Sequence, residues 1–228
     1  MNRYISAMII ATLTGPAAQA QTLQLAPRLV VNITIDQLRN DYIEHYSPLY
    51  SQNGFKKLLQ QGCVYEAASY PVEPVDRASA IATIATGTTP FYHNILGIKW
   101  LDRKTLRPVF CIDDAQYKTS PGKLSTSTIS DELKVSSNGS SIVVGIAPQR
   151  DMAVLSAGHA ADGAVWIDDK TGNWATSSYY SDKAQKWLNA YRSTKPRPDQ
   201  KPAGMNDAVS NLAIDYLKDN AMGRDDVT

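Results

Sequence analysis

Two polar residues that can do chemistry each adjoin an apolar or small-residue segment. Asp36 follows the apolar run Val30–Ile35, and Arg77 opens a stretch of small residues that closes at Thr86-Gly87. A carboxylate at the carboxyl end of a buried strand is a good ligand for a hard cation. A helix that begins near Arg77 would offer its free N–H groups to an anion. This order of elements is common in hydrolytic sites of α/β proteins.

Each of these features also has a structural interpretation. The stretch Ala78–Ala85 has the composition of a buried core helix, and Asp36 is equally suited to cap a helix or join a salt bridge. Ser79 is the hydroxyl nearest to Arg77, but two helix positions turn it by about 200° round the axis, so we assign it to packing. His159 is best interpreted as a hydrogen-bonded core histidine.

Four segments together resemble the alkaline phosphatase superfamily, in particular its branch of secreted phosphatases and type I phosphodiesterases/nucleotide pyrophosphatases. They are Ile35–Tyr42, Gly54–Leu59, Pro74–Trp100 and Leu155–His159. The resemblance covers most of the chain after the N-terminal leader, residues 1–20, and corresponds to the N-terminal half of the family's domain. It implies two zinc ions and hydrolysis of phosphate mono- or diesters, in which a Ser or Thr oxygen attacks phosphorus.

At the reacting position this sequence departs from the family. By the resemblance, Asp36 matches the first metal-binding aspartate, whereas Arg77 stands where the Ser or Thr nucleophile is expected. A guanidinium stays protonated and has no lone pair to donate, so Arg77 cannot attack phosphorus. It could instead hold an anion, or pair with Asp36 or Asp76 in a pocket without metal.

The phosphate-binding positions differ as well. Ile98 falls where the branch has an Asn that binds a phosphoryl oxygen, and Gln149 and Asp151 fall where it has a Lys and an Arg. If that loop is aligned one residue differently, Arg150 reaches the pocket and binds substrate there. The three histidines of the chain cannot complete a two-zinc site, so we expect the zinc site to be incomplete.

Three functional hypotheses follow from these residues. The leading one is a catalytically weak or inactive member of the family, a possible pseudoenzyme. The first alternative is an active metal-dependent hydrolase in a full-length form that uses another nucleophile, such as zinc-bound water. The second is a regulatory homologue in which Arg77 binds phosphate or sulfate. The expected partner is therefore a phosphate ester or another small oxyanion.

Composition and the N-terminus set the class of protein. A chain of 228 residues with 43% apolar content suits one α/β domain, over residues 21–228, and a net charge of +1 gives no reason to expect nucleic acid.

Residues 1–20 have the basic start, apolar run and small-residue cleavage site of a signal peptide, which predicts a secreted or periplasmic protein. No later run is long enough for membrane insertion. Whether Cys63 and Cys111 form a disulfide, and the oligomeric state, stay open.

The predicted fold is an α/β, alkaline-phosphatase-like sheet flanked by helices, incomplete in this chain, with an inserted β-hairpin region. Apolar runs predict strands, and amphipathic or small-residue segments predict helices. The strands are expected at 27–36, 64–70 and 141–147, and a hairpin at 164–180. The helices are expected at 54–61, 77–85, 128–135 and 206–220. Residues 97–117 are expected to form an excursion over the surface, in which Asp113-Asp114 is a solvated turn.

Overall fold

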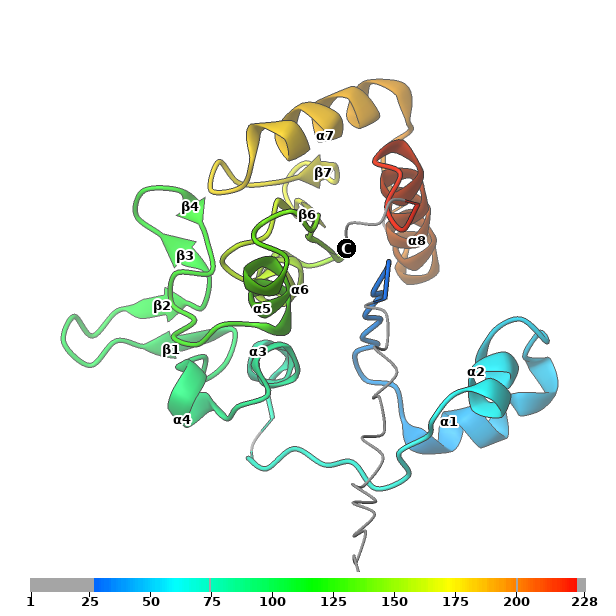
Figure 1. Ribbon diagram of the computed structural model, residues 1–228. Helices are drawn as coiled ribbons and strands as arrows, with labels where there is room; N and C mark the ends of the chain where they lie inside the picture. Colours follow the sequence, from blue (N-terminus) through cyan, green and yellow to red (C-terminus); the bar gives the residue numbers. More distant parts are fainter. Residues whose placement is uncertain (1–26, 74, 200, 225–228) are drawn as a thin grey trace, which may run out of the picture.

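The computed structural model describes residues 27–73, 75–199 and 201–224 of the chain (Figure 1). The predicted signal peptide, residues 1–20, lies outside the described residues. None of the helices in these three ranges is both long and apolar enough to cross a lipid bilayer.

A three-stranded sheet forms the centre of the molecule. Its strands are β5 (Val144–Ile146), β6 (Gly163–Ile167) and β7 (Trp174–Ala175), in the order β5-β6-β7. β5 and β6 run parallel, whereas β6 and β7 form an antiparallel pair. The strand predicted at 141–147 and the hairpin predicted at 164–180 are therefore confirmed, although β5 is shorter than expected.

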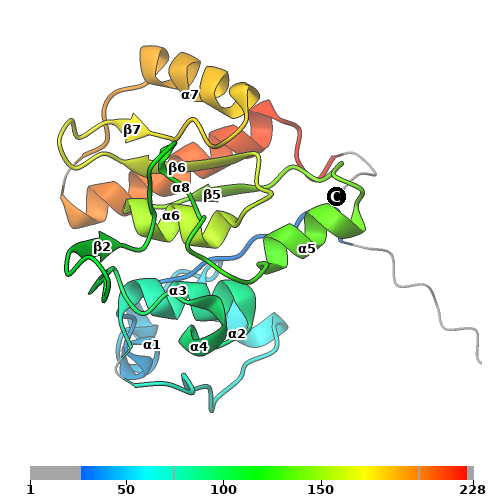
Figure 2. The ribbon, with the colours of Figure 1, turned by 90° about the vertical axis from the view of Figure 1, so that its left-hand side faces the viewer.

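Helices cover both faces of this sheet, because β6 is apolar on both of its faces. Ala164 and Trp166 point to the cluster that includes α6 (Arg150–Ala157) and α3 (Arg77–Thr86). Val165 and Ile167 point to the opposite cluster, which includes Leu188 of α7 (Asp182–Thr194) and Leu212 of α8 (Pro202–Asp219). Figure 2 shows these layers: α7 above the sheet, α6 below it, and α3 below α6.

One glycine permits the close approach of α6 to the sheet. A Cβ at Gly145 would lie 2.3 Å from the Ala153 carbonyl oxygen and 2.9 Å from the Ala157 Cβ. No side chain fits in that space, so the contact between β5 and α6 depends on glycine here.

The small-residue helix α3 forms as the sequence predicts. Asp76 caps it by accepting a 2.8 Å hydrogen bond from the Ala78 N–H, and Gly87 ends it in the left-handed conformation, with φ 67°. Ser79 is buried, and its hydroxyl accepts from the Asp76 N–H at 3.1 Å. The assignment of Ser79 to packing agrees with these contacts.

The remaining elements lie at the periphery of the core. The N-terminal part contains α1 (Asn40–His45), the 3₁₀ helix η1 (Ser47–Leu49) and α2 (Phe55–Gln61), and α4 (Pro90–His93) and α5 (Ile129–Ser136) follow. The surface excursion consists of two antiparallel hairpins, β1 (Lys99–Leu101) with β2 (Pro108–Phe110) and β3 (Asp113–Asp114) with β4 (Lys118–Thr119). The predicted helices at 54–61, 128–135 and 206–220 correspond to α2, α5 and α8.

Two predicted strands are wrong: residues 27–36 and 64–70 have no regular secondary structure. Within the first segment Val30, Val31 and Ile33 are 59%, 59% and 76% exposed. A buried parallel strand needs a neighbouring strand and a covering layer on each face, and the described residues give this segment neither. Figure 1 shows it as the dark blue trace that leads to α1 and α2, away from the sheet.

Candidate functional site

The N-terminal ends of α3 and α6 meet at one ion pair. Arg77 is the first residue of α3, and Asp151 is the second residue of α6. The Arg77 Nε donates to Asp151 Oδ2 at 3.0 Å and the Nη2 donates to Oδ1 at 3.0 Å, which is a bidentate pair. The side chains are 27% and 10% exposed, so water screens the pair only in part.

Two further carboxylates act on the same arginine. The hydrogen bonds that Arg77 donates to Asp151 hold the pKa of Arg77 above its ordinary value, against the opposing effect of burial, and the charges of Asp151, Asp36 and Asp76 add to the rise. Asp36 therefore lies within electrostatic reach of Arg77, on an exposed turn in which Gln37 has φ 59°. The hydrogen-bonded partner of Arg77 is Asp151, not Asp36 or Asp76.

Apolar and sulfur-bearing groups line the neighbourhood of this pair. Ile98 packs against the hydrophobic core, and its carbonyl oxygen accepts a 3.0 Å hydrogen bond from the Cys111 N–H. Burial, together with the charges of Asp151 and Asp76, raises the pKa of the Cys111 thiol to about 12. Cys111 is therefore protonated at neutral pH and is not a nucleophile. No sequence pattern around this isolated cysteine predicts that it lies near the site.

Arg150 points to a different part of the molecule from Arg77. Its Nη1 donates to Thr119 Oγ1 at 3.1 Å and its Nη2 to Asp113 Oδ1 at 3.4 Å, both on the β3–β4 hairpin. Gln149 is the N-cap residue of α6, without a side-chain capping bond. The role of Arg150 in substrate binding stays a prediction.

The two residues of the acidic pair have different partners: Asp113 accepts from Arg150 of α6, whereas Asp114 accepts within and just after its own hairpin. Asp114 accepts hydrogen bonds from the Gln116 and Tyr117 N–H groups, each at 2.8 Å, and from Ser120 Oγ at 2.7 Å. These bonds leave Asp114 as a turn-forming residue, as the sequence predicts.

The histidines do not converge with these carboxylates. His93 is buried, with Nε2 3.1 Å from Thr83 Oγ1, and His159 lies between Asp131 and the Leu124 carbonyl oxygen. Across residues 27–73, 75–199 and 201–224, no three His, Cys, Asp or Glu side chains are grouped so that they can hold a metal ion. The described residues therefore do not fit a two-zinc site.

His159 belongs to a buried hydrogen-bond network at the start of α5. Its Nδ1 lies 3.1 Å from Asp131 Oδ2 and its Nε2 lies 3.0 Å from the Leu124 carbonyl oxygen. Both partners are acceptors, so this geometry favours the protonated imidazole, in which both ring nitrogens donate, and the pKa of His159 is raised accordingly. Asp131 also accepts from the Thr128 and Ala160 N–H groups at 2.8 Å and 2.7 Å.

Comparison with known proteins places these features in a family. Residues 30–226 match the family model described as type I phosphodiesterase/nucleotide pyrophosphatase. The chain is 37% identical over 179 residues to a protein named calcium-transporting ATPase from Myroides odoratus, with 74% of this chain and 33% of that protein covered. It is 33% identical over 190 residues to the alkaline phosphatase PhoV from Synechococcus elongatus, with 79% and 34% covered.

The fold is shared with a third relative, the alkaline phosphatase PafA from Elizabethkingia meningoseptica, which is 32% identical over 200 residues, with 82% of this chain and 36% of PafA covered. The crystal structure of wild-type PafA superposes with a TM-score of 0.70 at 33% identity, over 73% of this chain and 34% of that one. The chain thus spans about a third of the length of these curated relatives. It belongs to the type I phosphodiesterase/nucleotide pyrophosphatase family of the alkaline phosphatase superfamily.

Proposed function

We propose that this protein is a phosphoric ester hydrolase homologue that hydrolyses phosphate mono- or diesters weakly or not at all. The observation that carries the proposal is the bidentate pair of Arg77 and Asp151, with both bonds at 3.0 Å. By the family resemblance, this pair takes the place of the hydroxyl nucleophile and of a cation that holds the phosphoryl oxygens.

The charges of the pair explain why turnover should be lost. Arg77 has no lone pair with which to attack phosphorus, and its positive charge opposes a metal ion at the same place. Asp151 neutralises that charge and would repel a phosphate dianion at close range. Arg77 thus replaces a hydroxyl with a cation, and Asp151 replaces a cation with an anion. The resulting ion pair can neither attack phosphorus nor bind phosphate well.

The zinc chemistry of the family belongs to this proposal only as an expectation. Asp36 is the residue we assign to the metal, and a zinc ion would supply the Lewis acid that activates an oxygen nucleophile. Because the described residues do not fit such a site, no step is assigned to zinc here. Export rests on the leader at residues 1–20, and the whole protein would act on ester substrates outside the cytoplasm.

Turnover of the full-length natural protein tests the proposal. The zinc-loaded protein is assayed with nitrophenyl phosphate and bis-nitrophenyl phosphate, with and without a chelator. The expected rate equals that of the chelated sample. Zinc-dependent hydrolysis as fast as that of an active alkaline phosphatase assayed alongside, lost on chelation, would contradict the proposal and support an active enzyme.

A thermal-shift titration separates the inactive protein from an anion-binding one. Phosphate and sulfate are added to the wild type and to Arg77→Gln. Because the Arg77 guanidinium is already hydrogen-bonded to Asp151, neither anion is expected to bind Arg77 and shift the melting temperature. A shift that Arg77→Gln removes would instead favour the oxyanion-binding alternative.

A further inference from the structure

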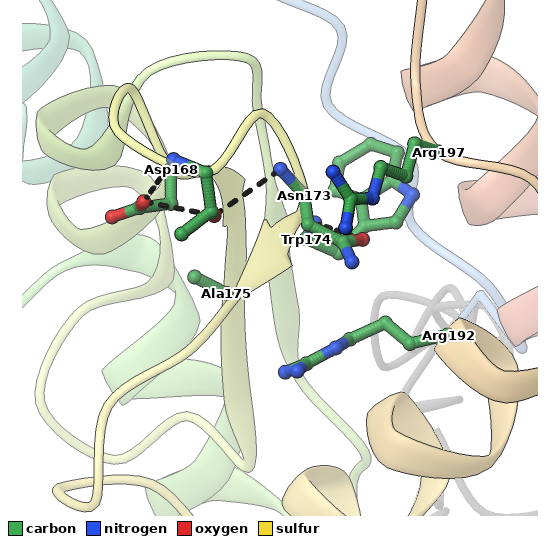
Figure 3. Close-up of a pocket in the computed structure, with 7 residues that line it drawn as sticks. Asp168, Asn173, Trp174, Ala175, Arg192 and Arg197 are labelled. Atoms are coloured by element: carbon green, nitrogen blue, oxygen red, sulfur yellow. Dashed lines mark hydrogen bonds between the residues drawn. The ribbon is translucent and has the colours of Figure 1, made fainter.

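A pocket of about 440 Å³ lies between the β6–β7 turn and the end of α7. The turn residues Asp168, Thr171 and Asn173 and the β7 residue Trp174 line it together with two arginines, Arg192 and Arg197 (Figure 3). None of the residues around Arg77 lines this pocket, so the two sites are separate. From the sequence, only the hairpin is predicted for this turn.

Within residues 27–73, 75–199 and 201–224, no carboxylate forms a salt bridge with either pocket arginine. Figure 3 shows the two guanidinium groups directed from the α7 side toward the turn. Among the described residues, neither group has a carboxylate within salt-bridge distance, whereas Lys195 between them pairs with Asp215 at 3.0 Å. Asp219, the other acidic residue of α8 that faces α7, accepts from Trp187 Nε1 at 3.0 Å. The carboxylates of Asp215 and Asp219 thus already have partners other than the two pocket arginines.

The backbone holds both arginines in place. Arg192 lies in the last turn of α7, which is anchored to the core by the buried Leu188. Arg197 stands between Pro196 and Pro198, whose rings fix their own φ angles and restrict the residue between them to an extended conformation. Pro198 is buried. An anion that binds here would need to order only the side chains, which lowers the entropic cost of binding.

The turn offers both a donor and an acceptor. Asn173 Oδ1 accepts from the Trp174 N–H at 2.9 Å, which leaves the amide nitrogen of Asn173 as a donor. Asp168 Oδ1 accepts from the Thr171 N–H and Oγ1, each at 2.9 Å, and from the Lys170 N–H at 3.2 Å. These bonds lower the pKa of Asp168, with the Thr171 N–H bond contributing most, so the carboxylate stays ionised. Its Oδ2 remains as an acceptor.

We propose that this pocket binds a small phosphate monoester that carries a hydroxyl group. The phosphate dianion matches the two guanidinium forks of Arg192 and Arg197 and the Asn173 amide. The hydroxyl group donates to Asp168, whose negative charge disfavours a ligand that presents a second anionic group there. The single carboxylate against two guanidinium groups leaves the lining net positive, which suits a ligand with one anionic end. This site does not depend on the activity proposed for the Arg77 region.

Calorimetric titration of the full chain tests the site. The probe is glycerol 3-phosphate, with methyl phosphate as the ligand without a hydroxyl group and glycerol as the ligand without phosphate. Saturable binding of one molecule per chain is expected for glycerol 3-phosphate. Methyl phosphate should bind more weakly, and glycerol should give no heat of binding.

Variants locate the binding. Each of Arg192→Gln and Arg197→Gln should raise the Kd about tenfold, because each removes a charged hydrogen-bonding partner. The control is Arg103→Gln, an exposed arginine in the β1–β2 hairpin, which should leave the Kd unchanged. Both pocket arginines are exposed, so circular dichroism should show an unaltered fold. The absence of saturable binding, or a Kd that the Arg192→Gln/Arg197→Gln double variant leaves unchanged, would overturn the proposal, whatever the result of the ester assay.

Discussion

Arg77 and Asp151 lie 74 positions apart in the chain, yet their side chains meet in two parallel 3.0 Å hydrogen bonds at the N-terminal ends of α3 and α6. The two helices pack directly against each other, with buried Ala78 on one and buried Met152 on the other beside the pair. The same ion pair therefore joins two core helices and occupies the place at which the family resemblance locates the reacting oxygen.

Loss of one partner of this pair should destabilise the fold. Arg77→Met leaves the Asp151 carboxylate, 10% exposed, without its bidentate partner, and the expected cost is about 1–3 kcal/mol of unfolding free energy. Urea denaturation measures it. Arg77→Met/Asp151→Leu should recover part of the loss, because it removes the unpaired charge as well. Equal stabilities of all three proteins would contradict a structural role for the pair.

The stabilising contribution of His159 should be lost as the pH rises above 6.5. The hydrogen bond and the charge of Asp131 raise the pKa of His159 above 6.5 in the folded state, against the effect of burial. A group whose folded pKa is raised stabilises the fold fully below its unfolded pKa of 6.5, and this contribution is lost as pH rises through the folded pKa. Melting temperatures measured from pH 5.5 to 9 should show this decline in the wild type and in the exposed-histidine control His45→Gln. His159→Gln should abolish it, and an undiminished decline there would contradict the assignment.

The same network should also weaken in acid. Burial opposes ionisation of Asp131, but the hydrogen bonds from His159, Ala160 and Thr128 outweigh it and lower the pKa of Asp131 below 3.8. The contribution of Asp131 is therefore present above pH 3.8 and is lost as pH falls through the folded pKa. Asp131→Asn should flatten the acid limb of the stability curve measured by urea denaturation. An acid limb as steep as that of the wild type would exclude this origin.

Gly145→Ala should damage the core more than the same change at Gly87. The new Cβ would lie 2.3 Å from the Ala153 carbonyl oxygen, and such overpacking costs about 1–3 kcal/mol or more. Gly87→Ala serves as the matched comparison, since its Cβ meets nothing within 4 Å and only the φ of 67° opposes it, at about 1 kcal/mol. Thermal unfolding should rank Gly145→Ala as the less stable variant. The reverse order would refute the close contact of β5 with α6.

The two thiols should differ in reactivity. Both cysteines are free, with Cys63 exposed and Cys111 buried, and burial raises the pKa of Cys111 to about 12. A thiol-specific reagent at pH 8 should modify one cysteine per native chain quickly and both in denaturant. Cys63→Ser should remove the fast reaction. No reactive thiol in the unreduced protein would instead indicate a disulfide.

The sequence predicted the local elements that carry their own start and stop signals. Asp76, the small residues after it and Gly87 define α3, and the polar turn near Asp168 defines the β6–β7 hairpin. Helix α7 was not predicted: it fully buries only Ala184 and Leu188, while Trp187 and Tyr191 pack against the core only in part. The apolar run at 27–36 predicted a strand, since composition cannot reveal whether a neighbouring strand exists.

The sequence identified Arg77 as the unusual residue of the site but not its partner. The choice of Asp151 over Asp36 and Asp76 depends on how α3 and α6 pack against each other in the core. Long-range pairings of this kind leave no periodic signal along the chain. For the same reason, the pocket between the β6–β7 turn and α7 could not be predicted.

The most direct test of the central claim is ester hydrolysis by the zinc-loaded full-length protein before and after the charges are exchanged for family-like groups. Arg77→Thr supplies a hydroxyl, and Asp151→Arg supplies a cation for the phosphoryl oxygens. The account predicts no zinc-dependent turnover of nitrophenyl phosphate by the wild type, and a gain of about a hundredfold over its background rate in Arg77→Thr/Asp151→Arg, larger than in Arg77→Thr alone. A wild type that hydrolyses the ester with zinc, and loses that activity when Arg77 is replaced, would contradict it.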